Sequence, residues 1–129
     1  MSVLGIGIDI VEVSRIRASL ERHGERFHRR ICLESEAAYC TRMRDSAPFF
    51  AARFAAKEAV SKALGTGIGE QCSWHDIEVR RKTSGEPFIV LHGAGAATAK
   101  RLGIACVLIS LSHTENYAAA QAMALGEPV

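Results

Sequence analysis

The chain has 129 residues, of which 48% are hydrophobic and 23% are charged, and its formal net charge is +2. This size and balance fit a single globular domain, residues 1–129, and argue against intrinsic disorder. A charge so near neutrality gives no support for a nucleic-acid partner, and no apolar run approaches the roughly 20 residues that a membrane span requires.

The cysteine pattern indicates a reducing compartment. The four cysteines form no CxxC pair and have no histidine at metal-ligand spacing: Cys32, Cys40, Cys72 and Cys106. No basic and then apolar leader opens the sequence. We therefore expect reduced thiols in a cytoplasmic protein.

The first third of the chain predicts one strand and two helical segments. Residues 2–10 alternate β-branched and small side chains and are apolar on both sides, which predicts a central strand of a sheet. Apolar residues then recur at helical steps from Val13 to Ile31, and Gly24 loosens or ends this first helix. Residues 34–44 predict a second, short helix.

The remaining chain predicts two more helices and four strands. The run Asp45-Ser46-Ala47-Pro48 is a helix-start signal, so we expect a third helix over 48–64 that stops at Gly65. The later elements are predicted from alternation, turn residues and alanine content: a hairpin of 77–82 and 88–91, a helix over 93–102, and strands over 104–112 and 116–125. The order β-α-α-α-β-β-α-β-β predicts one α+β domain with helices packed on a mixed or antiparallel sheet.

The third helix carries its charges in two pairs. Arg53 and Lys57 are four residues apart, as are Glu58 and Lys62. These charges could belong to solvated surface ion pairs, each worth ~0.5 kcal/mol at most. They could instead form a ligand site, because the helix is otherwise nearly free of polar side chains. The glycine loop 65–69 could offer backbone amides, although a helix C-terminus repels anions and the lysines would have to compensate.

Asp9 is an isolated acid within an apolar strand. It lies between Ile8 and Ile10, where an unpaired carboxylate is costly to bury. It could cap the helix that begins near Val13, or pair with an arginine. Alternatively, Asp9 and Glu58 together could hold Mg²⁺, which takes a few carboxylates, several waters and the phosphate oxygens of a substrate.

Two further groups of polar residues have alternative interpretations. His113, among the hydroxyls of 110–114, could contact a phosphate or accept a proton, or could be a structural hydrogen-bonding residue. Arg15, Arg22, Arg26 and Arg30 follow seven- and four-residue steps and so share one helical face. That face could be merely solvated, or it could dock an acidic partner.

The two acidic segments resemble the signature motifs of a known family. Gly5-Ile6-Gly7-Ile8-Asp9 and Phe54-Ala55-Ala56-Lys57-Glu58-Ala59 resemble the motifs of the 4′-phosphopantetheinyl transferases. The length and the ending 110–120 are similar to the small bacterial branch, so the resemblance covers essentially the whole chain. It implies that family's fold and the transfer of 4′-phosphopantetheine from coenzyme A to a serine of apo-acyl carrier protein. The products would be holo-acyl carrier protein and adenosine 3′,5′-bisphosphate, in support of fatty acid biosynthesis.

The resemblance also implies roles for individual residues. Asp9 and Glu58 would hold Mg²⁺ on the coenzyme A pyrophosphate, and Lys62 would neutralise charge on the bridging and leaving oxygens. The nucleotide phosphates would be held by Arg53, Lys57, Gly65, Thr66, Gly67, Ser112, His113 and Thr114. The carrier protein would dock on Arg15, Arg22, Arg26 and Arg30. Members of this size are homotrimers with the site at a subunit interface. The base that deprotonates the serine stays open between a metal-bound water, Glu58 and His113.

Two other functions are less consistent with the residues. A module that binds carrier protein or coenzyme A without turnover would not explain two acids at positions 9 and 58. A nucleic-acid binder using the arginine-rich helix conflicts with the scarce aromatic residues and the near-neutral charge.

Overall fold

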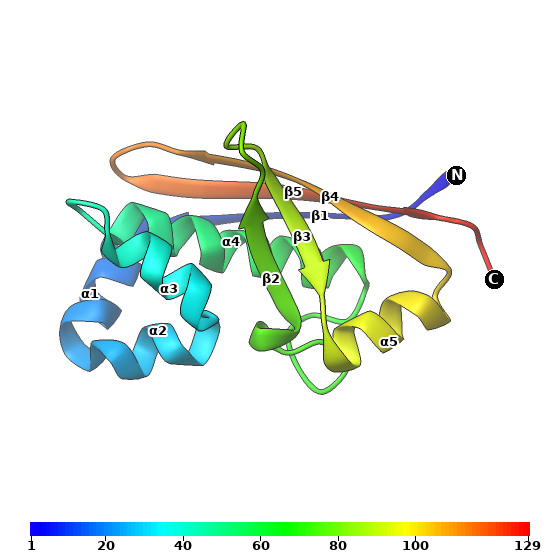
Figure 1. Ribbon diagram of the computed structural model, residues 1–129, viewed down its shortest axis with the longest axis horizontal. Helices are drawn as coiled ribbons and strands as arrows, with labels where there is room; N and C mark the ends of the chain where they lie inside the picture. Colours follow the sequence, from blue (N-terminus) through cyan, green and yellow to red (C-terminus); the bar gives the residue numbers. More distant parts are fainter.

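A computed structural model describes all 129 residues as a long three-stranded sheet with helices and a hairpin on one of its faces (Figure 1). The elements are β1 (Ser2–Glu12), α1 (Val13–His23), α2 (Glu25–Ile31), α3 (Glu34–Thr41), α4 (Ala47–Ala63), β2 (Ile77–Arg81), β3 (Pro87–Leu91), α5 (Gly93–Arg101), β4 (Ile104–His113) and β5 (Tyr117–Gly126). The sheet order is β1-β5-β4, and β2 and β3 form a separate hairpin; every pair is antiparallel. The predicted α+β class is confirmed, and each predicted strand and helix has a counterpart in the fold, except that the predicted first helix is two helices, α1 and α2.

Helix α4 packs closely against the sheet because both surfaces carry small side chains. The inward residues of β5 are four fully or nearly buried alanines, Ala118, Ala120, Ala122 and Ala124. On β1, a Cβ atom at Gly5 would lie 2.0 Å from the carbonyl oxygen of Ala63, and one at Gly7 would lie 1.9 Å from that of Ala59. These two glycines therefore let β1 approach α4, and the alternation of the strand places Asp9 on the same face.

We expect Gly7→Ala to destabilise the fold strongly. The added methyl group would collide with the backbone of α4, so strand and helix must separate, which costs about 3 kcal/mol at the upper end of ordinary overpacking. Gly69→Ala is the matched control, because nothing lies within 4 Å of that position. Urea unfolding of both variants checks this. Equal midpoints for the two variants would mean that β1 does not approach α4 this closely.

The position of β1 corrects one expectation from the sequence. β1 is an edge strand of the sheet, not a central one. Its outward isoleucines, Ile6, Ile8 and Ile10, are 66–68% exposed, and Leu108 on β4 is 54% exposed. The strand is apolar on both sides because one side packs on α4 and the other forms an open apolar sheet surface.

The predicted first helix is broken into two. Gly24 has φ +55°, a conformation that favours glycine, and it ends α1 and starts α2. The arginine face predicted for one continuous helix is thus divided, with Arg15 and Arg22 on α1 and Arg26 and Arg30 on α2. No helix of the fold has the length and apolar character needed to cross a bilayer.

Candidate functional site

The two predicted acids lie together in the folded chain. Asp9 comes from β1, and Glu58 comes from the face of α4 that packs against it. Partial burial, and then the negative charge of Asp9, raise the pKa of Glu58 above its ordinary value, while Lys62 opposes the rise. The Nζ atom of Lys62 lies 3.3 Å from Oδ1 of Asp9 and donates to the carbonyl oxygen of Ile8 at 2.9 Å. The expected grouping of Asp9, Glu58 and Lys62 is therefore present.

These donors fit a cation that completes its coordination with water and substrate. No group of three or more histidine, cysteine, aspartate or glutamate side chains is arranged to hold a metal ion. Two carboxylates alone would be a poor zinc site, but they match the sparse protein coordination that magnesium accepts beside a phosphorylated substrate. A hollow of about 380 Å³ lies at Lys62 and is lined also by Ile6, Gly7, Ile8 and Gln121.

Lys57 does not contact this site. Its side chain is fully buried, and its ammonium group donates to Oε1 of Glu36 at 2.7 Å and to the carbonyl oxygens of Ile31 and Trp74. An ammonium group has three hydrogens, so all of its donors are used. The expectation that Lys57 holds a nucleotide phosphate is corrected, because this lysine joins α4 to α2, α3 and the segment before β2.

The glycine loop after α4 does not offer free amides either. The amide of Gly65 donates to the carbonyl oxygen of Lys62, and the amides of Thr66 and Gly67 donate to that of Ser61. The positive φ angles of Gly65 and Gly67 allow this closure, which satisfies carbonyl groups at the end of the helix. The predicted phosphate-binding role of these three residues through their backbone is therefore not supported, and the loop is a helix cap.

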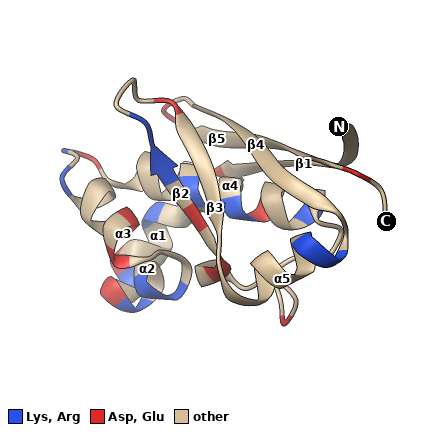
Figure 2. Cartoon of the chain, turned by 45° about the vertical axis from the view of Figure 1, so that its right-hand side comes forward, with Lys and Arg blue, Asp and Glu red and all other residues tan.

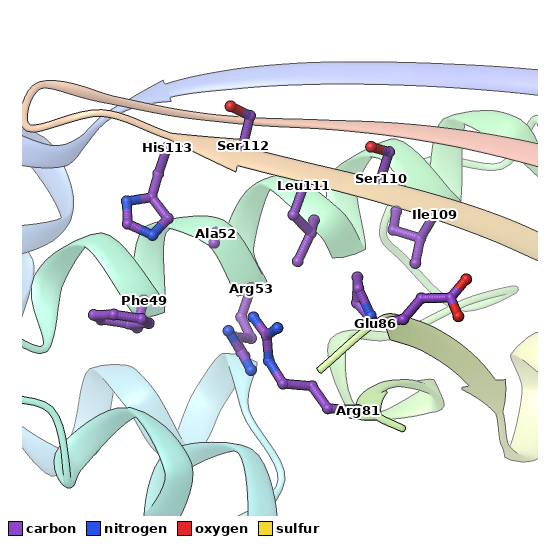
Figure 3. Close-up of a pocket in the computed structure, with 11 residues that line it drawn as sticks. Phe49, Ala52, Arg53, Arg81, Glu86, Ile109, Ser110, Leu111, Ser112 and His113 are labelled. Atoms are coloured by element: carbon purple, nitrogen blue, oxygen red, sulfur yellow. The ribbon is translucent and has the colours of Figure 1, made fainter. Parts of the chain in front are cut away.

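A second group of predicted residues lines a pocket at the β4 edge of the sheet. This pocket has a volume of about 490 Å³ and lies between α4, β4 and the β2–β3 hairpin (Figure 3). Arg53 reaches it from α4 and Arg81 from the hairpin, and the ring of His113 stacks edge-on to that of Phe49 with centroids 5.2 Å apart. Nε and Nη1 of Arg53 are buried without a hydrogen-bond partner, which is rare, and such donors suit an anionic ligand.

The three residues predicted at the end of β4 are not equivalent. Figure 3 shows His113 directed toward Phe49 on the helix side, while the hydroxyl group of Ser112 points to the other side of the strand. The Oγ1 atom of Thr114 accepts hydrogen bonds from the amides of Asn116 and Tyr117, so it closes the β4–β5 turn. Ser112 and His113 thus both line the pocket, His113 with its ring on the helix side, whereas Thr114 does not line it.

Sequence reasoning missed Arg81, Phe49 and Glu86 as pocket residues. Arg81 ends β2 next to the turn that leads to Glu86, and the pairing Arg81↔Pro87 brings both sides of the hairpin to the pocket. Nothing in the sequence distinguishes an arginine at the end of a hairpin strand from an ordinary surface arginine. Only the packing of the hairpin beside β4 shows that it lies next to Arg53.

The two groups lie at opposite edges of the sheet. Asp9 on β1 is paired with Ala120 on β5, which is paired with Leu111 on β4, two residues before His113. Two strand spacings, about 10 Å, therefore separate the edges, and α4 lies between them. Arg53 and Glu58, five residues apart on α4, point to different sides of that helix. One chain thus carries a carboxylate group and a cationic pocket that do not face each other.

The basic residues predicted to bind a partner are exposed and carry no carboxylate partner. Arg17 and Arg29 of the same segment are paired, with Asp45 and Glu25 respectively. The four predicted residues form no salt bridge: Arg15, Arg22, Arg26 and Arg30. Figure 2 shows basic residues gathered on α1 and α2, at the end of the molecule away from both chain termini.

The fold and the site define a small α+β protein whose carboxylate and arginine groups suit a phosphate-rich ligand. The sequence model of the 4′-phosphopantetheinyl transferase superfamily matches residues 5–122. A holo-(acyl-carrier-protein) synthase of Koribacter versatilis is 50% identical over 118 residues, which cover 92% of this chain and 94% of that protein.

Solved structures agree with this match. The holo-(acyl-carrier-protein) synthase of Neisseria meningitidis has a TM-score of 0.89 at 32% identity, covering 96% of this chain and 99% of that one. The enzyme of that name from Bacillus anthracis, in complex with CoA (3′,5′-ADP), has a TM-score of 0.81 at 37% identity, covering 97% and 98%. This chain belongs to the 4′-phosphopantetheinyl transferase superfamily.

Proposed function

We propose that this protein transfers 4′-phosphopantetheine from coenzyme A to a serine hydroxyl of apo-acyl carrier protein, releasing adenosine 3′,5′-bisphosphate. The observation that carries the proposal is the approach of Asp9 to Glu58, with Lys62 3.3 Å from Asp9. The family membership and the coenzyme A complex of the Bacillus anthracis relative support it. A cytoplasmic location stays a prediction.

Asp9 and Glu58 are the residues that would hold Mg²⁺. When bound, the ion would offset the negative charge of the pyrophosphate and of the departing phosphate group. The two carboxylates come from β1 and α4, and the close packing at Gly5 and Gly7 fixes their relative position. Attack on a pyrophosphate phosphorus needs mainly in-line positioning and charge stabilisation, so a rigid pair of acids suits the reaction.

Lys62 and Glu58 would have different roles in the transfer: Lys62 would contact a phosphate oxygen, and Glu58 could accept the serine proton. Lys62 has a half-exposed side chain, so its ammonium group can contact a phosphate oxygen while it remains near Asp9. Glu58 is a candidate base for the serine proton, although its raised pKa describes the site without a metal ion and bound Mg²⁺ would lower it. His113 of the same chain lies in the arginine pocket at the other sheet edge, so Glu58 is the better placed of these two side chains.

We further propose that the complete site forms between copies of the chain in a homotrimer. The open sheet surface carries Ile6, Ile8, Ile10 and Leu108, all more than half exposed, which is a large apolar patch for a soluble protein. Covering it with a neighbour's sheet edge would bring the Asp9–Glu58 group of one copy to the Arg53 pocket of the next. The nucleotide phosphates would then bind Arg53 and His113 while the pyrophosphate binds beside the acids.

The acyl carrier protein would dock on the exposed arginines of α1 and α2. We expect Arg22→Glu combined with Arg26→Glu to raise the KM for carrier protein at least about tenfold at low salt, because acidic carrier proteins are steered by positive charge. The KM for coenzyme A should change little. Steady-state kinetics with each substrate varied in turn check this, with Lys100→Glu on α5 as control. Equal effects on both KM values would contradict docking on this face.

The proposed reaction is tested by mass spectrometry of apo-acyl carrier protein incubated with the protein, coenzyme A and Mg²⁺. Addition of one phosphopantetheine mass, lost on chelation, is the expected result. Tight association without a mass change would instead show a binding module.

A further inference from the structure

Tyr39 on α3 lies at the centre of an unneutralised cluster of arginines. The guanidinium carbons of Arg53, Arg81 and Arg42 lie 4.5, 5.1 and 5.6 Å from the centroid of its ring. All three distances are within the range of cation–π attraction. The three arginines come from α4, β2 and the end of α3, so one ring joins cations from three separate elements.

No carboxylate neutralises these cations. Arg42, Arg53 and Arg81 form no salt bridge. Arg53 is 2% exposed, and its Nε and Nη1 have no hydrogen-bond partner. Arg81 has only the carbonyl oxygen of Gly85 as partner, at 2.7 Å. Burial of an unpaired guanidinium group is costly, so some contact other than an ion pair must offset it.

The aromatic ring supplies that contact without occupying the hydrogen-bond donors. A cation above a ring is attracted to the electron-rich face, while its N–H groups remain free in the plane of the guanidinium. A carboxylate in the same place would hold the arginines more strongly but would compete with an incoming phosphate. Figure 3 shows Arg53 and Arg81 side by side, and both residues line the pocket.

We propose that Tyr39 is a positioning residue that holds Arg53 and Arg81 ready for a phosphate group of the ligand. This inference rests on the proposed function, since it takes the pocket to bind the nucleotide part of coenzyme A. Tyr39 does not touch the ligand; it acts through the two arginines. This role requires an electron-rich aromatic ring at position 39. The hydroxyl group of the tyrosine contributes less to it than the ring does.

The test measures binding of adenosine 3′,5′-bisphosphate and of coenzyme A by calorimetry to wild type, Tyr39→Phe and Tyr39→Leu. We expect Tyr39→Leu to weaken both ligands about 5- to 30-fold, and Tyr39→Phe to stay within about threefold of wild type. Tyr39→Leu should raise the KM for coenzyme A more than it lowers kcat, and should leave the KM for carrier protein unchanged.

A second series separates the ring's electrostatics from its packing. Phenylalanine at position 39 is replaced by its mono-, tri- and pentafluorinated forms, which keep the shape but remove electron density from the ring face. The Kd should rise stepwise along the series. Equal affinities along it, or a Tyr39→Leu variant that binds as wild type does, would overturn the role of Tyr39. Failure of the wild type to bind either ligand would instead reject the proposed function.

Discussion

Asp9→Ala and Glu58→Ala are each expected to reduce phosphopantetheine transfer by about 10²–10³-fold or more, because each removes one of two carboxylates that would hold the cation on the pyrophosphate. The loss should appear in kcat at saturating coenzyme A and carrier protein, since the arginine pocket remains intact. Raising the Mg²⁺ concentration should recover part of the Asp9→Ala activity if the defect is in metal affinity. Glu12→Gln, an exposed acid on the same strand, is the control.

Measurements of folding stability distinguish a loss of transfer activity at the site from misfolding of the variant. Folding raises the pKa of Glu58, so the folded chain binds that proton more tightly than the unfolded chain. Ionised Glu58 therefore costs folding free energy as pH rises above the ordinary glutamate value, and Asp9 contributes to this cost by charge repulsion. Asp9→Asn should lower the pKa of Glu58, measured by carboxyl-carbon NMR titration, without lowering stability at neutral pH. An inactive but unfolded Asp9→Asn chain would not support the catalytic role.

Mixing two inactive variants is expected to restore activity. If the acids of one copy meet the arginine pocket of another, an Asp9→Asn chain and an Arg53→Met chain can together build intact sites. In randomly mixed trimers about one site in four receives both intact halves. Co-purified mixed assemblies should therefore regain roughly a quarter of wild-type activity, while each variant alone remains inactive at low coenzyme A.

The alternative gives a different result. If both halves of the site came from a single chain, every site in the mixed assembly would carry a lesion, and mixing would restore nothing. Light scattering on the same samples measures the mass of the assembly. A monomeric mass for the active protein would contradict the shared site directly.

Local patterns in the sequence were enough to predict the strands and most of the helices, because each depends on periodicity and on nearby turn residues. The Gly5–Asp9 strand, the helix of Glu58 and Lys62 and the break at Gly24 all follow from spacing within a few residues. The resemblance of two motifs to those of a known family predicted the family, and the match to the superfamily over residues 5–122 confirms it. The meeting of Asp9 and Glu58 was expected on that basis, and the fold brings them together.

Other parts of the site depended on contacts between residues far apart in the chain. Lys57 and Glu58 are adjacent, yet the helix turns Lys57 into the core against Glu36 and leaves Glu58 beside Asp9. Arg81 joins Arg53 only because the hairpin packs beside β4.

The sequence alone thus determined most of the elements through local spacing, and its motifs indicated the family and the acidic pair. Only the tertiary structure decided which basic side chains are buried and paired in the core, which have no carboxylate partner, and which strand lies at the edge of the sheet. Burial and hydrogen-bond partners depend on how distant segments pack, and no local pattern of residues encodes that packing.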